Sequence, residues 1–208
     1  MKSSLTCLVS LLLVLGLSGC AGFKGKRLDP VDSLPEPKNR PSVQARLELE
    51  QFVNDGPTTL FPESAEHFRR MALVRTFRKT EVFSKVGTNL NNPDITVDVR
   101  MQTRAHINYF STFLTGLTLY LVPSQVTDEF DLRARVTNQT GQQWTITLED
   151  HVTLWQHISL LPLMPFKTVP EAMIEVHDNM YRHLVKEMLE RDIIQNSEQV
   201  QLSYRVNP

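Results

Sequence analysis

Three long stretches of alternating apolar and polar residues place the strongest limit on the fold of this chain. They cover residues 94–107, 130–137 and 144–155. In the first of them, the apolar positions are Ile95, Val97, Val99 and Met101. Because successive side chains of a strand point to opposite faces, the pattern predicts three long strands that each bury one face only.

The second and third of these strands are separated by a short turn sequence. Asn138-Gln139-Thr140-Gly141 joins them, and Gly141 can supply the positive φ that a tight hairpin turn requires. We therefore expect an antiparallel pair. Residues 43–53 also alternate and favour a further strand, although a short amphipathic helix fits the same stretch, and 199–206 favours a terminal edge strand.

Two other stretches have helical periodicity. Residues 63–79 follow Pro62, with acidic residues at the start and basic residues at the end. A second helix begins near Thr168, where Glu171 completes a capping box. Its apolar stripe is Met173, Val176, Met180, Leu184 and Met188. Methionines at this spacing indicate a core-facing helix rather than a cofactor site.

The order of these elements predicts the fold class. Helices that lie on one face of a largely antiparallel sheet form an α+β two-layer sandwich, here with two main helices. The composition agrees, since 41% hydrophobic residues in 208 are enough for one globular domain. The 22 basic and 23 acidic residues leave no positive surplus, which argues against nucleic acid as a partner.

The first twenty residues have the features of an export signal. Lys2 precedes an apolar run over 5–17, which is followed by Leu17-Ser18-Gly19-Cys20. This pattern resembles the bacterial lipobox, which implies removal of residues 1–19 and a lipid anchor (palmitate) on Cys20. By the same resemblance, Ala21 at the next position implies the outer membrane, with the domain facing the periplasm.

The remaining chain divides by composition. Residues 20–42 contain four prolines and two glycines and show no apolar period, so we expect a semi-extended tether after the lipidated Cys20. Residues 43–208 have the length of one periplasmic α+β domain.

Two apolar segments are candidates for an interaction surface. Residues 109–123 carry no charge and fit either a helix or a strand, and 160–166 contain Pro162 and Pro165. The candidate contact residues are Phe113, Leu117, Leu119, Leu121, Leu163, Met164 and Phe166. These segments are either buried core or an exposed patch that docks on a partner, a bilayer or a second copy of the chain.

The helix over 63–79 also has a basic character. Its candidates for contact with an anionic polymer or lipid headgroup are Arg69, Arg70, Arg75 and Arg78. A solvated helix face is the alternative interpretation.

Signatures of catalysis and metal binding were sought in the sequence. It contains no GxSxG, HExxH, SxxK, P-loop or GxGxxG motif, and no cysteine after Cys20. The pairs His151 with His157 and His177 with His183 lack metal-ligand spacing. We therefore expect a protein that is not an enzyme, with no catalytic residue, metal or cofactor.

The segments TFLTGLTLYLVPS and LLPLMPF, in this order of elements, resemble a family of poorly characterised proteobacterial outer-membrane lipoproteins. More distantly, the chain is similar to the α+β domain of the TolB amino-terminal domain, the curli-secretion lipoprotein and transport-auxiliary lipoproteins. The resemblance implies a non-enzymatic interaction or assembly module in the cell envelope, with an envelope protein or lipid as partner. Alternatives are an oligomeric export or pore subunit and an auxiliary lipoprotein of lipid transport.

Overall fold

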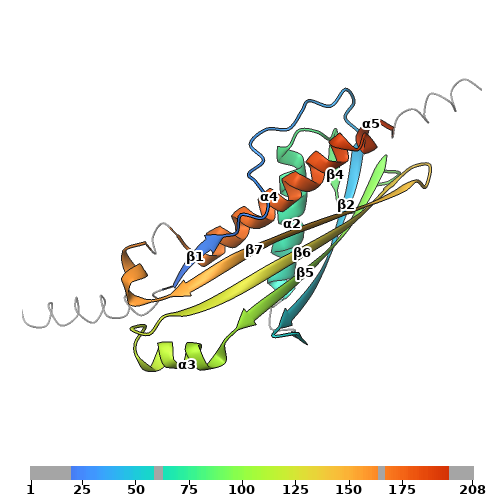
Figure 1. Ribbon diagram of the computed structural model, residues 1–208. Coiled ribbons are helices and arrows are strands. Elements are labelled where there is room, and N and C mark those ends of the chain that lie inside the picture. Colours follow the sequence, from blue (N-terminus) through green and yellow to red (C-terminus); the bar gives the residue numbers. More distant parts are fainter. Residues whose placement is uncertain (1–19, 59–62, 164–166, 197–208) are drawn as a thin grey trace, which may run out of the picture.

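The computed structural model describes residues 20–58, 63–163 and 167–196, which form one mixed sheet and its covering helices (Figure 1). The strands are β1 (Cys20–Lys24), β2 (Ser42–Val53), β3 (Gly56–Pro57), β4 (Lys85–Gly87), β5 (Ile95–Ile107), β6 (Ser124–Asn138) and β7 (Gln143–Gln156). The helices are α2 (Glu63–Lys79), α3 (Tyr109–Leu117), α4 (Val169–Glu190), α5 (Ile193–Asn196) and the 3-10 helix η1 (Ile158–Leu163).

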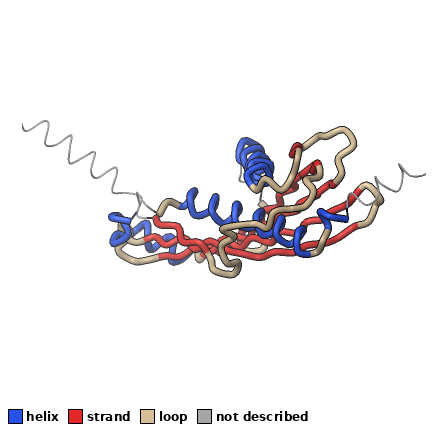
Figure 2. The backbone as a smooth tube through the Cα atoms, turned by 90° about the horizontal axis from the view of Figure 1, so that it is seen from above, coloured by secondary structure: helices blue, strands red, loops and turns tan. Residues whose placement is uncertain are grey.

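The seven-stranded sheet has the order β1-β7-β6-β5-β2-β3, and β4 pairs with β2. β5, β6 and β7 form an antiparallel meander, whereas β2 runs parallel to β5 after a crossover through α2. Helices α2 and α4 pack against each other and cover one face of the sheet (Figure 2). The predicted α+β sandwich with a largely antiparallel sheet is therefore confirmed.

The alternation found in the sequence explains which face is covered. The register brings Val99, Ala134 and Ile146 into one row across β5, β6 and β7, and all three are buried. The apolar stripe of α4 covers this buried face of the sheet. Its residues Val176, Met180, Leu184 and Met188 are buried, and Met173 is partly buried against the core. Thr168 caps this helix as predicted, accepting a hydrogen bond from the backbone N–H of Glu171 at 3.3 Å.

Several predicted boundaries can be compared with the structure. The strand interpretation of 43–53 is correct, and Gly141 adopts the expected positive φ of 81°. The strand predicted over 130–137 is longer, since β6 begins at Ser124. The leader over 1–19 and the terminal strand over 199–206 lie outside the described residues.

The expected tether over 20–42 is instead packed on the domain at several points. β1 adds an edge strand to the sheet, antiparallel to β7. Gly22 makes this possible, because a Cβ there would lie 2.9 Å from the Cα of Val169 at the start of α4. Further along, Val31 is buried and its backbone N–H donates to Asn179 Oδ1 at 3.0 Å. The prolines had indicated an extended chain, but an extended chain can also lie along a neighbouring element.

Candidate functional site

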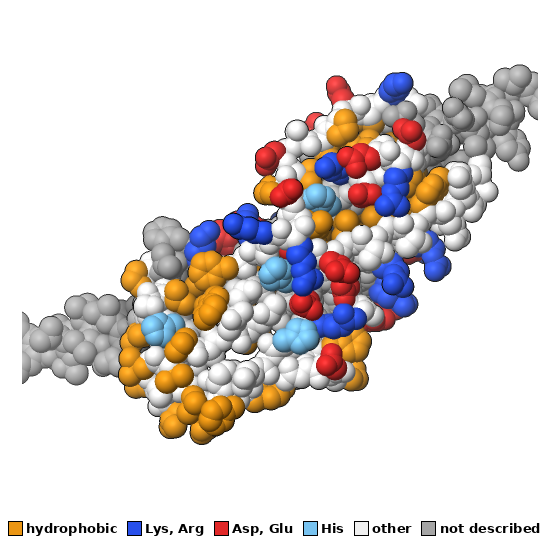
Figure 3. Space-filling model, in the orientation of Figure 1, with side chains coloured by type: hydrophobic (Ala, Val, Ile, Leu, Met, Phe, Trp, Pro, Cys, Tyr) orange, Lys and Arg blue, Asp and Glu red, His pale blue; other side chains and the backbone are white. Residues whose placement is uncertain are grey.

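One end of the sheet carries most of the exposed large hydrophobic side chains. Ten of the thirteen that the described residues contain are found there, around α3 and the adjoining ends of β1, β6 and β7. We call this surface the apolar end. Its residues are Phe23, Tyr109, Phe110, Phe113, Leu117, Leu119, Leu121, Val122, Trp155 and Ile158. Figure 3 shows these hydrophobic side chains gathered over α3 and beside it.

The strand register places Cys20 at the same end. Cys20 is the first residue of β1 and pairs with Gln156, the last residue of β7. Gln156 pairs in turn with Ser124, the first residue of β6. Residues 109–123 directly precede β6, and η1 follows β7 after His157, so both lie next to the half-buried Cys20.

Helix α3 is inverted relative to an ordinary surface helix. Phe110, Phe113 and Leu117 lie on one side and are 65–73% exposed, whereas Thr115 is buried. An ordinary surface helix turns its apolar stripe toward the core and its polar side toward water. Here the apolar side chains have no cover from the chain's own described residues.

The hydroxyl groups of α3 are bonded within the helix. Thr115 Oγ1 donates to the backbone oxygen of Ser111 at 2.8 Å, and Ser111 Oγ donates to that of Asn108 at 3.0 Å. The same carbonyl accepts from Thr112 Oγ1, while Asn108 Oδ1 caps the first turn by accepting from the N–H of Ser111. These hydroxyls therefore need no water to satisfy them.

The chain leaves α3 through two consecutive residues with positive φ, Leu119 at 50° and Tyr120 at 65°. For residues with a Cβ this left-handed conformation is unfavourable, by roughly 1–2 kcal/mol each. It is held by hydrogen bonds from the N–H of Tyr120 to the oxygen of Thr115 at 2.8 Å and from the N–H of Ile158 to the oxygen of Tyr120 at 2.9 Å. The turn projects Leu119 outward and joins α3 to η1.

The apolar end is free of formal charge. The sequence contains no Asp, Glu, Lys or Arg in 20–23, 107–127 or 152–166. Beside α3, a hollow of about 400 Å³ is lined by Phe23, Pro123, Trp155, His157, Ser159 and Leu160. These segments therefore offer a partner shape and apolar contact, and charged groups lie only beside them, as Lys167 and Glu171 do next to Phe23.

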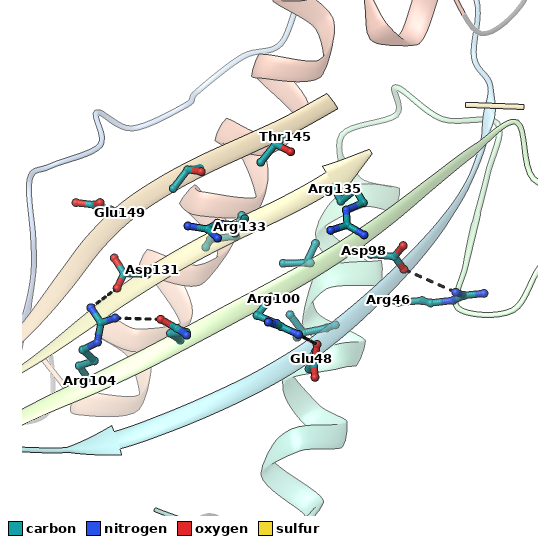
Figure 4. Close-up of a pocket in the computed structure, with 15 residues that line it drawn as sticks. Arg46, Glu48, Asp98, Arg100, Arg104, Asp131, Arg133, Arg135, Thr145 and Glu149 are labelled. Carbon is teal, nitrogen blue, oxygen red and sulfur yellow. Dashed lines mark hydrogen bonds and ion pairs between the residues drawn. The ribbon is translucent and has the colours of Figure 1, made fainter. Parts of the chain in front are cut away.

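The face of the sheet that α2 and α4 leave uncovered is charged, in contrast to the apolar end. A hollow of about 750 Å³ lies on this face, lined mainly by charged side chains of β2, β5, β6 and β7. Figure 4 shows the side chains that line it. Cross-strand ion pairs neutralise much of the charge, as between Arg100 and Glu48 at 3.0 Å and between Arg104 and Asp131 at 2.6 Å. Such exposed pairs contribute little stability, about 0–1 kcal/mol each.

A third group of polar residues is buried between the helices and the sheet. His177 on α4 packs edge-on against Phe130, with ring centroids 4.7 Å apart, and burial together with nearby Arg69 lowers its pKa to about 3. Burial raises the pKa of Tyr181, and it also raises that of Asp128 although Arg69 opposes the shift. Burial lowers the pKa of Arg69 itself. The environment disfavours charge at every one of these groups.

The four arginines predicted on α2 do not form one surface. Arg69 interacts electrostatically with Asp128 and Tyr181, and Arg78 donates to the backbone oxygen of Val86 at 3.0 Å. Arg70 and Arg75 are exposed. Arg75 and Arg78 line a shallow hollow of about 430 Å³ whose apolar wall includes the exposed Phe68 and Met71.

The predicted interaction residues divide into two groups. Phe113, Leu117, Leu119 and Leu121 are brought together at the apolar end, each 65–67% exposed. Leu163 lies at the end of η1 and its side chain is not among those described; Met164 and Phe166 fall outside the described residues. The sequence interpretation missed Phe23, Trp155 and Ile158. The lack of charge over 152–166 was the signal that could have found the last two.

The described residues contain no helix with the length and apolarity needed to span a bilayer. Within the same ranges, no group of three or more His, Cys, Asp or Glu side chains is arranged to hold a metal ion. Neither a spanning segment nor a metal centre can therefore be assigned to this part of the chain.

No protein-family model and no curated protein matches the chain. Among solved structures, the PelC dodecamer from Paraburkholderia phytofirmans is similar at 10% identity, over 76% of this chain and 97% of that one, with a TM-score of 0.28. At that level, the similarity supports no inference about function.

Proposed function

We propose that this protein is an outer-membrane lipoprotein, anchored through Cys20, that acts as a non-enzymatic interaction module facing the periplasm. Its contact surface is the apolar end. Cleavage after Gly19 leaves Cys20 as the first residue, and the acyl chains on it provide the membrane attachment.

The observation that carries this proposal is that Cys20 lies beside the apolar end. An exposed apolar surface of this kind is costly in water, at about 25 cal/mol per Å² of apolar area. Contiguous apolar patches on soluble proteins mark contacts with proteins or membranes. The position of Cys20 beside the patch supports a contact made at the membrane that holds the anchor.

Labelling with radioactive palmitate tests the anchor. We expect the wild-type protein to incorporate label and to sediment with the outer membrane, because the thiol of Cys20 carries the lipid. Cys20→Ser removes that thiol and should abolish both. The Cys7→Ser variant is the matched control and should behave as wild type, since Cys7 belongs to the leader. An unlabelled wild-type protein, or one recovered from the cytosol, contradicts the proposal.

The mass of the detergent-extracted protein tests the alternative of an oligomeric export subunit. In that alternative the apolar end lies between copies, so a closed ring should persist after extraction. The interaction module proposed here predicts a monomer, because detergent replaces whatever covers the apolar end.

A further inference from the structure

We propose that the apolar end inserts into the interface of the bilayer that holds the acyl chains of Cys20. The occupant of this surface is thus lipid, and the domain is fixed to the membrane at a second place besides its anchor. The inference rests on the proposed function and names the partner of the same surface.

The short distance between the anchor and the apolar end is the first argument. Cys20 is itself the first residue of β1, so no linker separates an acylated Cys20 from the sheet. β1 is held by its pairing with β7 over Cys20–Lys24, and Gly25 N–H donates to the oxygen of His151 at 2.7 Å. The surface beside Cys20 is therefore brought to the membrane by the anchor itself.

The chemistry of the apolar end is the second argument. A protein partner is usually recognised with polar and charged groups at the rim of the contact. The segments 20–23, 107–127 and 152–166 carry no formal charge themselves. Charged groups border them beside Phe23, where Lys167 and Glu171 line a hollow with it. Charged side chains are also the most costly groups to place in a bilayer, and their absence from these segments removes that cost.

Helix α3 supplies the third argument. Lipid offers no hydrogen bonds, so polar groups that enter it must be satisfied internally. The hydroxyls of Ser111, Thr112 and Thr115 already donate to carbonyls of their own helix or its cap. The outward side presents Phe110, Phe113 and Leu117, as the lower face of an interfacial helix does.

Two aromatic residues of the apolar end are of the types that favour the membrane–water interface. Tyr109 is 65% and Trp155 39% exposed, and Tyr and Trp are the side chains enriched at membrane–water interfaces. The charged residues that line a hollow beside Phe23, Lys24 on β1 with Lys167 and Glu171 at the start of α4, then lie on the aqueous side of this interface.

The two tryptophans of the chain allow a direct test. Trp155 lies at the apolar end, whereas Trp144 lies near the start of β7, toward the opposite end of the sheet. Trp144→Phe leaves Trp155 as the sole reporter, and Trp155→Phe leaves Trp144 as its matched control. Each acylated variant is reconstituted into phosphatidylcholine vesicles whose chains are brominated close to the headgroup, and its emission is compared with that in unbrominated vesicles.

We expect brominated lipid to quench most of the emission of Trp155 and none of that of Trp144. The double variant Phe113→Ser/Leu117→Ser should lose the quenching of Trp155 while remaining on the vesicles through its acyl chains. Phe68→Ser/Met71→Ser removes two exposed apolar residues on α2 and should keep the quenching. Circular dichroism establishes that both double variants are folded.

The possible failures can be told apart. A protein that carries no acyl chain and does not bind vesicles contradicts the proposed function. A protein that is acylated and bound, with Trp155 as unquenched as Trp144, overturns the inference alone. Unquenched Trp155 together with a multimeric mass shows that a second copy of the chain covers the apolar end.

Discussion

His177 shows how a single buried residue couples the stability of this fold to pH. Its imidazole packs against the rings of Phe130 and Tyr181 and is buried, so the neutral form is strongly preferred. Its pKa falls from 6.5 to about 3, first through burial and second through Arg69. The unfolded chain takes up a proton below pH 6.5 that the folded chain does not.

Stability should therefore fall as the pH drops below 6.5, by about 1.4 kcal/mol per pH unit, until the folded-state value near 3 is reached. From pH 7 to pH 5 the loss attributable to His177 is about 2 kcal/mol. Burial raises the pKa of Asp128 above 3.8, so the folded chain takes up that proton first. Asp128 therefore adds stability as the pH falls through its raised pKa, opposite to His177. Urea unfolding of wild type and His177→Gln at both pH values isolates the histidine, since Asp128 is present in each. Parallel pH curves for the two proteins contradict this assignment.

At the scale of elements, β1 is the part of the structure that the sequence predicted least well. The prolines and glycines of 20–42 are typical of a linker, but Gly22 in β1 and Gly25 directly after it lie where the chain passes very close to α4 and β7. Such an approach depends on three-dimensional neighbours, and no local pattern reports it. The long strands and α4 were predictable because alternation and helical period are local consequences of burying one face.

Gly22→Val should release β1. The new Cβ would lie 2.9 Å from the Cα of Val169 and 3.1 Å from the Cβ of Ala172, and backbone cannot move aside cheaply. We expect a loss of about 1–3 kcal/mol in the free energy of unfolding and faster proteolysis within residues 20–30. Gly116→Ala is the matched control, because nothing lies within 4 Å of a Cβ at Gly116. Equal cleavage rates in the two variants contradict the close packing of β1.

Helix α3 shows a different limit of prediction. The segment 109–123 fitted a helix or a strand, because it is apolar at nearly every position except its hydroxyl residues. The structure chooses a helix for Tyr109–Leu117, with Asn108 as its cap. Its hydroxyls bond back to the helix, which makes Ser and Thr acceptable on the covered side and leaves the phenylalanines outside. Hydrophobicity alone fits equally well a helix whose phenylalanines face the core.

At the scale of the whole molecule, the fold separates two kinds of surface. The apolar end lies at the tip of a long sheet, beside Cys20, and the charged hollow lies on the uncovered face of the same sheet (Figures 3 and 4). Seven of the ten residues of the apolar end lie in the segment 109–123 that the sequence identified. It could not join Phe23, Trp155 and Cys20 to that segment, because only the pairing of β1 with β7 and of β7 with β6 brings them together.

The central claim is that the apolar end is covered in the envelope by the membrane that Cys20 enters. The sequence has two cysteines, Cys7 in the predicted leader and Cys20, so a single engineered thiol can report on this in the cleaved and acylated protein. Leu117→Cys is compared with Met71→Cys, which is exposed on α2, in isolated envelopes treated with a membrane-impermeant maleimide. The account predicts that the thiol at 117 reacts far more slowly than the thiol at 71, until detergent removes the difference. Equal reaction rates in intact envelopes would contradict it.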